Sequence, residues 1–110
     1  MTKKDIDDTR KIYGMISNID DNLGKVVNKL KELRIEDETI IIFMTDNGPQ
    51  QFRYNGNMKG RKGSVYNGGI RVPFFLKVPN KFKDVKVKEI NKLSAHIDLV
   101  PTISELCDVE

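Results

Sequence analysis

The residues best suited to chemistry follow directly on an apolar run in the middle of the chain. Residues 45–48 read Thr-Asp-Asn-Gly, so a carboxylate, Asp46, stands beside a side-chain amide, Asn47. Carboxylate and amide oxygens are hard ligands of the kind that Ca²⁺ and Mg²⁺ prefer. In open α/β sheets, ligands bind beyond the carboxyl ends of the strands. Spacing alone leaves a metal site and a tight turn both open, because Asn-Gly is also a strong hairpin signal.

A second segment with chemical potential lies further along the chain. Residues 59–64 read Lys-Gly-Arg-Lys-Gly-Ser, and three cations among glycines can hold a tetrahedral oxyanion. A Walker A loop is excluded, because Gly56 and Gly60 are too close together. Lys62 is also followed by Gly rather than by Ser or Thr. The alternative interpretation of this segment is an exposed basic loop.

Scarce residue types exclude several kinds of site. The sequence holds one cysteine, Cys107, and one histidine, His96. These numbers exclude an internal disulfide, a cysteine-built zinc site and a metal site built from several histidines. We expect Cys107 to be a buried apolar residue on the last helix. No apolar stretch reaches the roughly 20 residues of a membrane span, and none follows Met1, so we expect neither a membrane span nor a signal peptide.

Basic charge is concentrated in one block. The net charge is +3, but residues 50–92 hold 11 Lys or Arg against 2 Asp or Glu. A basic block suits an anionic partner. A small nucleic-acid-binding module is one alternative, since Phe52, Tyr54 and Tyr66 lie in the block. These aromatic residues do not recur at a stacking spacing, so we expect no nucleic-acid partner and a solvated face for the lysine-rich residues 77–92.

The elements that must position these segments follow from hydrophobic periodicity. Seven apolar residues spaced three and four apart predict a long N-terminal helix with an apolar stripe along one face. We expect this stripe to pack on a sheet rather than form a coiled coil. Residues 39–45 and 72–78 predict strands, the first of them buried on both faces as in a parallel sheet. From Asp98 to Cys107 we predict a short helix that Asp98 caps. The stripe consists of Ile12, Ile16, Ile19, Leu23, Val26, Leu30 and Leu33.

A long glycine-rich loop separates the two predicted strands. Six of the eight glycines fall within residues 48–69. Loops of this length are usually functional or disordered, and glycine lets the backbone approach a ligand closely. The predicted fold class is therefore α/β, with an active-site loop, in a single segment that spans residues 1–110.

Read together, these segments resemble the sulfatase family of the alkaline-phosphatase-like superfamily. The family carries T/S-D-N-G after a strand, which residues 45–48 match. It next carries G-x-K-G-[ST]-x-Y-E-G-G-x-R-x-P, which residues 60–73 match except that Asn67 replaces Glu. A later H-x-D-L-x-P-T segment matches residues 96–102, and an earlier D-D-N-x-G element matches residues 20–24. Four elements in family order over nearly the whole chain make the resemblance specific, and it implies a partial alkaline-phosphatase-like fold.

The resemblance implies roles for three residues. Asp46 and Asn47 correspond to ligands of the family's metal, usually Ca²⁺, with Mg²⁺ as the alternative ion. Lys62 corresponds to the lysine that contacts the sulfate group and stabilises charge developing on it. It would therefore be both a catalytic and a substrate-binding residue, because a preorganised cation favours the transition state over the ground state.

Other polar residues in the matched segments are expected to have no chemical role. His96 is not at a standard catalytic position of the family, so we expect it to be structural. Lys59 and Arg61 have no clear family counterpart and are expected to be solvated. Tyr66 and Arg71 are expected to fix the loop.

Several parts of the family's active site are missing from the sequence. Sulfatases use a formylglycine made from Cys or Ser in a C/S-x-P-S-R motif, and no such motif occurs here. The family's N-terminal pair of Asp ligands, its other lysine and its catalytic histidines are missing too. We therefore expect a fragment of a sulfuric ester hydrolase, or a truncated reading frame starting at an internal methionine, which is inactive without the N-terminal part of its domain.

Partners and location follow less directly from the sequence. The resemblance implies a sulfate ester as the substrate of the full enzyme. A phosphodiesterase or phosphonate monoester hydrolase of the same superfamily is the enzymatic alternative, because it shares the metal-ligand plan. An incomplete sheet would have open edges, so self-association is a hypothesis. Location stays open, since relatives are often periplasmic, secreted or lysosomal.

Overall fold

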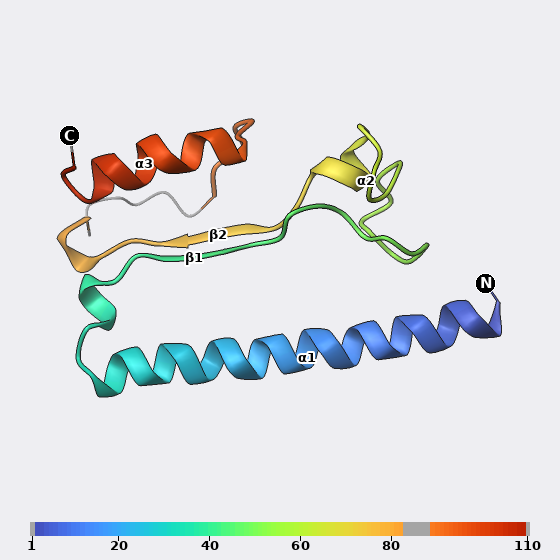
Figure 1. Ribbon diagram of the computed structural model, residues 1–110, viewed down its shortest axis with the longest axis horizontal. Helices are drawn as coiled ribbons and strands as arrows, with labels where there is room; N and C mark the ends of the chain where they lie inside the picture. Colours follow the sequence, from blue (N-terminus) through green and yellow to red (C-terminus); the bar gives the residue numbers. More distant parts are fainter. Residues whose placement is uncertain (1, 83–88, 110) are drawn as a thin grey trace.

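A long helix, a two-stranded ribbon and a short C-terminal helix make up the computed structural model, which describes residues 2–82 and 89–109 (Figure 1). The strands are joined by a loop, residues 45–73, that contains one helical turn and is called the glycine-rich loop below. In chain order the elements are α1 (Lys3–Glu32), η1 (Glu36–Glu38), β1 (Ile41–Met44), α2 (Asn67–Ile70), β2 (Phe74–Lys77), η2 (Asn80–Phe82), η3 (His96–Asp98) and α3 (Leu99–Leu106).

The predicted N-terminal helix is confirmed, and α1 begins well before the apolar stripe. Its first turn is closed by a capping box between Thr2 and Asp5. The Thr2 backbone N–H donates to Asp5 Oδ2 at 2.7 Å, and the Asp5 backbone N–H donates to Thr2 Oγ1 at 3.2 Å. These bonds satisfy helix N–H groups that otherwise have no partner. The hydrogen bonds from Thr2 also lower the pKa of the Asp5 carboxyl.

Strands β1 and β2 form an antiparallel ribbon, so the prediction of buried, parallel-type strands is wrong. The register pairs Ile41 with Lys77 and Met44 with Phe74. The glycine-rich loop reverses the chain, whereas a parallel pair needs a crossover connection, usually a full helix. Each strand has one neighbour among the described residues, and the Phe75 side chain is 65% exposed.

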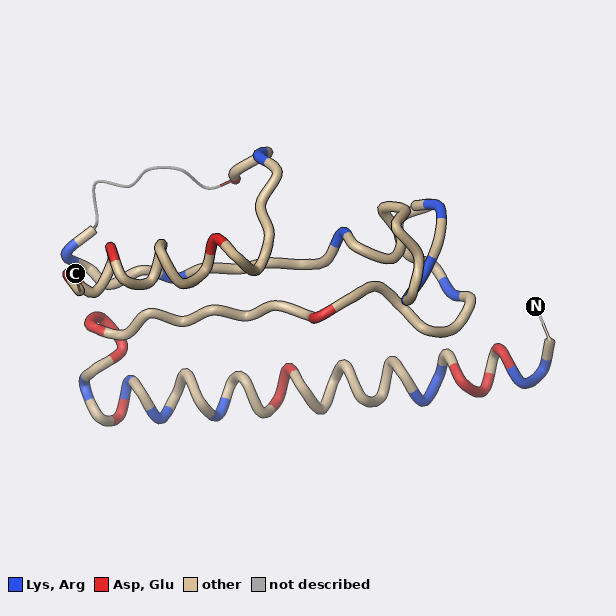
Figure 2. The backbone as a smooth tube through the Cα atoms, turned by 45° about the horizontal axis from the view of Figure 1, so that its top comes forward, with Lys and Arg blue, Asp and Glu red and all other residues tan. Residues whose placement is uncertain are grey.

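The apolar surfaces of the described residues do not close into a core. No hydrophobic residue in residues 2–82 and 89–109 is buried. The radius of gyration is 17.1 Å, against about 13 Å for a compact domain of this length. Figures 1 and 2 show α1 running alongside the ribbon. The predicted packing of the stripe on a sheet is thus only partial, because Ile16 and Val26 stay 50% and 54% exposed.

The C-terminal helix is confirmed, but two details of its prediction are wrong. The Asp98 carboxylate accepts a hydrogen bond from the Ala95 backbone N–H at 2.7 Å and makes no side-chain cap bond to α3. Asp98 therefore closes the η3 turn instead. Cys107, expected to be buried, is exposed, because α3 contacts η3 and no other helix or strand that the structure describes.

Part of the lysine-rich stretch 77–92 is ion-paired rather than simply solvated. Lys77 Nζ lies 3.4 Å from Glu36 Oε1 and donates to the Glu36 carbonyl at 2.8 Å. Lys81 Nζ lies 3.0 Å from Asp108 Oδ2. Residues 83–88, which carry the same prediction, lie outside the described residues. Within the described ranges, no helix is both long and apolar enough to span a membrane.

Candidate functional site

The glycine-rich loop folds back onto the Thr-Asp-Asn-Gly segment at the end of β1 (Figure 1). The Gly48 N–H donates to the Gly69 carbonyl at 2.9 Å. The Lys62 N–H donates to the Pro49 carbonyl, also at 2.9 Å. The segment 45–48 is therefore bonded to the end of the α2 turn, and the basic segment 59–64 is bonded to Pro49, the residue that follows 45–48.

Close backbone contact at this junction depends on glycine. Gly68 and Gly69 are buried, and Pro79 is the one other buried residue in the described part of the chain. A Cβ at Gly48 would overlap the Gly68 carbonyl oxygen. A Cβ at Gly68 would overlap the Gly60 carbonyl oxygen and would lie 2.8 Å from Asn55 Nδ2. Backbone atoms on both sides leave no room for a side chain, so the glycines at 48 and 68 are sterically required.

Two polar side chains hold the turn that carries Lys62. Asn55 Nδ2 donates to the Met58 carbonyl at 2.9 Å and to the Gly60 carbonyl at 3.2 Å. Ser64 Oγ accepts a hydrogen bond from the Arg61 N–H at 3.1 Å. The Ser64 N–H donates in turn to the Arg61 carbonyl at 2.9 Å. The turn is thus fixed from within by local hydrogen bonds, which the sequence analysis did not foresee.

The three cations of the basic segment have different surroundings. Lys59 Nζ lies 4.0 Å from the centre of the Tyr66 ring, and Arg61 Cζ lies 4.2 Å from the centre of the Phe52 ring. Both are exposed, but they are not simply solvated as predicted. Lys62 is exposed, and its ammonium group takes part in no hydrogen bond, ion pair or ring contact among the described residues. It is the cation of this segment that is available to a ligand.

The local electrostatic environment favours an anion. The sequence has no Asp or Glu between Asp46 and Asp84. Figure 2 shows several Lys and Arg residues in the glycine-rich loop, and none of residues 47–73 is acidic. Within residues 47–73, no carboxylate competes with an incoming anion for Lys62, and Asp46 at the start of the loop is its one acidic residue.

Asp46 and Asn47 have the donor chemistry of a partial metal site. Asp46 is exposed and Asn47 is half-buried. Asn47 Nδ2 donates to the Gly48 carbonyl at 3.0 Å, which directs the amide nitrogen to the backbone and leaves Oδ1 as the free ligand atom. Within the described residues, no group of three or more His, Cys, Asp or Glu could hold a metal ion. The pair suits an oxygen-preferring cation but supplies few of the 6–8 oxygens that Ca²⁺ takes.

The residues expected to fix the loop do so through their backbone. The Tyr66 carbonyl accepts the Gly69 N–H at 2.7 Å, and the Arg71 N–H donates to the Asn67 carbonyl at 2.9 Å. These bonds form the α2 turn, which sequence periodicity did not predict because a single turn has no apolar repeat. His96 is exposed, and its backbone carbonyl accepts the Leu99 N–H at the end of η3.

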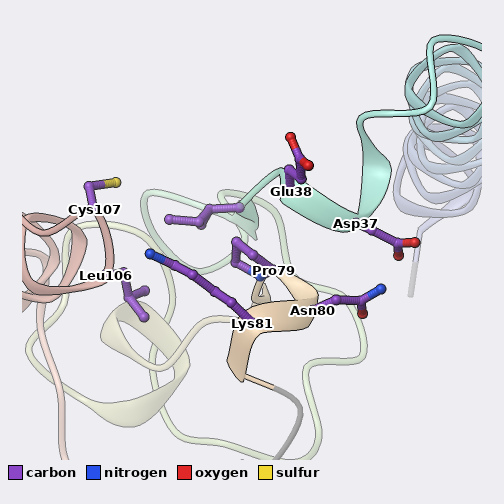
Figure 3. A pocket seen from close by; sticks show the side chains of 8 residues that line it. Asp37, Glu38, Pro79, Asn80, Lys81, Leu106 and Cys107 are labelled. Atoms are coloured by element: carbon purple, nitrogen blue, oxygen red, sulfur yellow. The ribbon is translucent and has the colours of Figure 1, made fainter.

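A hollow lies at the other end of the ribbon from the glycine-rich loop. It has a volume of about 630 Å³ and is lined by η1, η2 and the C-terminal end of α3. Figure 3 shows the Lys81 side chain extending from η2 toward Leu106 and Cys107. None of the residues predicted to bind metal or sulfate lines this hollow, so it is separate from the candidate site.

Comparison with known proteins identifies the class. The chain matches the sulfatase family over residues 2–109, and it belongs to that family. This confirms the resemblance drawn from the four motifs. Sulfatases are generally metal-dependent, which agrees with an oxygen-ligand pair in the candidate site. The helix and strand content is consistent with a partial sulfatase domain.

Individual relatives are similar over most of this chain. An N-acetylgalactosamine-6-O-sulfatase of Bacteroides thetaiotaomicron is 34% identical over 106 residues, covering 84% of this chain and 20% of that protein. Human steryl-sulfatase is 30% identical, covering 86% and 18%. An arylsulfatase of Clostridium perfringens is 33% identical, covering 88% and 20%. The chain thus spans about a fifth of the length of these curated relatives. No solved structure matches it.

Proposed function

We propose that the glycine-rich loop is the metal- and sulfate-binding part of a sulfatase active site. The reaction would be hydrolysis of a sulfate ester to an alcohol and sulfate. The observation that carries this proposal is the double junction of Gly48 with Gly69 and of Lys62 with Pro49. Among the described residues, Lys62 is the cation of the segment 59–64 whose side chain has no partner. Its backbone N–H is bonded to Pro49, which lies two residues after Asn47. Membership of the sulfatase family supplies the reaction class.

Lys62 is proposed to contact the sulfate group. A single ammonium group at a fixed place lowers the free energy of a transition state in which negative charge builds up on the sulfate oxygens. Its exposure, and the absence of Asp and Glu from residues 47–73, leave it accessible to an anion. The charged groups of Lys59 and Arg61 already lie over aromatic rings. We therefore do not propose that they bind sulfate directly.

Asp46 and Asn47 are proposed to hold the metal, Ca²⁺, with Mg²⁺ as the alternative ion. When bound, the cation would supply positive charge that polarises a sulfate oxygen. Asp46 would offer a carboxylate oxygen, and Asn47 would offer Oδ1, the atom left free by its bond to the Gly48 carbonyl. The remaining ligands would come from the N-terminal part of a sulfatase domain.

The nucleophile is proposed to come from outside these 110 residues. The family's nucleophile is a formylglycine, and this sequence has no C/S-x-P-S-R motif from which to make one. Residues 1–110 would therefore contribute binding and charge stabilisation, and without the complementary segment they would hydrolyse no sulfate ester.

The proposal is tested by titrating the full chain with sodium sulfate and following backbone amide shifts by NMR. We expect shifts at residues 59–64, and a loss of affinity of roughly tenfold in Lys62→Ala, since hydrogen bonds to charged groups contribute the most. Arg53→Ala is the matched control, because it removes an equal charge from the same loop. Equal weakening by both variants, or no sulfate-dependent shift in the loop, would contradict the proposal.

Metal binding is tested separately with calcium chloride. We expect Ca²⁺ to shift the amides of residues 45–48 and expect Asp46→Asn to abolish the shift, because one of the ligand charges is lost. Asp37→Asn, in η1 at the other end of the ribbon, should bind Ca²⁺ as the wild type does. An unchanged Ca²⁺ response in Asp46→Asn would rule out the assigned ligand.

A further inference from the structure

We infer that Arg61 is a positioning residue, which holds Lys62 against the segment after Asn47 by stacking on Phe52. The inference rests on the proposed function of Lys62. It concerns a residue that sequence reasoning had assigned to solvent.

Arg61 is tied to two parts of the loop at once. Its guanidinium Cζ lies 4.2 Å from the centre of the Phe52 ring, and Nη1 donates to the Gln50 carbonyl at 3.3 Å. Gln50 directly follows Pro49, and Phe52 lies three residues after it. Its backbone N–H and carbonyl are both bonded to Ser64, within the turn that carries Lys62. The Arg61 side chain therefore links that turn to the segment that continues from the proposed metal ligands.

The Arg61 side chain adds to a single backbone hydrogen bond that joins the turn carrying Lys62 to residues 45–52. The Lys62 N–H bond to the Pro49 carbonyl is the backbone bond that joins the basic turn to residues 45–52 in the described structure. Lys62 is exposed, so water competes for that bond. Arg61, the residue before Lys62, adds a second contact between the same two parts of the loop. That contact pairs a cation with an aromatic face, which is attractive even at an exposed site such as Phe52.

The geometry requires arginine rather than any cation. A planar guanidinium can lie over a ring and still donate an N–H in its own plane, and here one group meets Phe52 and Gln50 together. The ammonium group of lysine is a compact, strongly hydrated charge and cannot replace both contacts. Arg61→Lys therefore keeps the charge and removes the tie.

A second stacked cation in the same loop provides the control. Lys59 lies over Tyr66, and both belong to the folded part of the loop rather than to residues 45–52. Loss of this stack removes a cation–aromatic contact of the same kind without releasing the turn from the segment after Pro49. Lys59→Gln also changes the net charge by one, so it controls for general electrostatics.

The experiment measures two properties of each variant of the full chain, the exchange rate of the Lys62 amide and the affinity for inorganic sulfate. We expect Arg61→Lys and Phe52→Leu each to raise the exchange rate and weaken sulfate binding by roughly two- to fivefold. Phe52→Tyr keeps the ring and should behave as the wild type. Phe52→Leu combined with Arg61→Lys should be no worse than Arg61→Lys alone, because Arg61→Lys already removes the contact with the Phe52 ring. Lys59→Gln should leave the Lys62 amide unchanged.

Far-UV circular dichroism verifies that α1 is intact in every variant, and upfield shifts of the Arg61 side-chain protons report the stack itself. Wild-type exchange at Lys62 in Arg61→Lys and Phe52→Leu would overturn the inference, whatever sulfate does. Faster exchange with unchanged sulfate affinity, where Lys62→Ala does weaken binding, would also overturn it, because Arg61 would then support only the loop. If Lys62→Ala itself leaves sulfate affinity unchanged, the proposed function fails, and the positioning role fails with it.

Discussion

Gly68 and Gly69 are buried in a loop that holds itself together by backbone hydrogen bonds, whereas the apolar side chains of α1 and the ribbon remain half exposed. In the loop, the contacts that fix the fold lie within about 20 residues of each other along the chain. In α1 and the ribbon, the stripe and the strand faces are covered only in part by other described residues, with Phe75 65% exposed and Ile16 50% exposed.

The two regions are specified in different ways, the loop by steric exclusion and the helix and strands by their hydrophobic pattern. The loop is specified by steric exclusion, because glycine alone allows its carbonyls to pass so closely. The helix and strands are specified by hydrophobic pattern, which fixes the element but needs a further surface to bury its face. The candidate site is therefore held by hydrogen bonds within the loop. The α1 helix and the ribbon, in contrast, have exposed apolar faces that are suited to further contacts.

The largest effect is expected for Gly68→Ala in the loop. The added Cβ would meet the Gly60 carbonyl and lie 2.7 Å from the Lys59 carbonyl oxygen, and neither backbone atom can rotate away. We expect the loop to lose its fold, at a cost above about 2 kcal/mol. Amide exchange at Gly48 and Lys62 measures the loss, and α1 should keep its circular dichroism signal. Retained protection at both amides would contradict the steric argument.

The second effect concerns the ribbon, each of whose strands has one neighbour among the described residues. We propose that copies of the chain associate through its open edges, and we expect Phe75→Lys, which places a charge on the exposed ribbon, to weaken that association. Burying one phenylalanine contributes about 2 kcal/mol, which corresponds to roughly a thirtyfold change in the dissociation constant. Sedimentation at several protein concentrations measures the change. A wild-type chain that stays monomeric throughout would refute the association.

The third effect is a gain in stability in α1. At Gly14 a Cβ meets nothing within 4 Å. Gly14→Ala should therefore stabilise the helix by about 1 kcal/mol, because alanine loses less backbone entropy than glycine. Urea unfolding followed by circular dichroism measures the gain. The same substitution thus has opposite signs in the two regions, and a destabilised Gly14→Ala would show that α1 is as constrained as the loop.

The smallest effect is a pH dependence at the first turn of α1. Hydrogen bonds from Thr2 lower the pKa of the Asp5 carboxyl, so folding favours its charged form. The stabilisation is present at neutral pH and is lost as the pH falls through the lowered folded-state pKa. NMR shifts of the Thr2 and Asp5 amides should report fraying of this turn in acid. Asp5→Asn, which does not titrate, should show no such transition, and an identical acid response in both chains would disprove the assignment.

Local pattern was sufficient for much of this structure. The stripe from Ile12 to Leu33 predicted α1, and the apolar runs predicted strands where β1 and β2 lie. Thr2 and Asp5 carried a helix-start signal that the periodicity argument passed over, since a capping box needs no apolar residue. The site residues Asp46, Asn47 and Lys62 were predicted from motifs, and their roles remain proposals.

Pairing and burial could not be read from the same patterns. An apolar run such as 39–45 fits a parallel or an antiparallel strand equally well, and the direction depends on the path of the connecting loop. Cys107 was expected to be buried from its residue type, but exposure depends on what packs against α3. The stacking of Arg61 on Phe52 joins side chains whose proximity no periodicity encodes.

By itself, the sequence determined the helix, the strands and the family, because each depends on residue types at short spacing. It also supplied the residues that we propose to bind metal and sulfate. Tertiary structure alone decided the antiparallel register of β1 and β2 and the bond between the Lys62 N–H and the Pro49 carbonyl. Both depend on how a long loop closes. That closure is decided by which backbone groups can approach and bond once glycine removes the steric barrier.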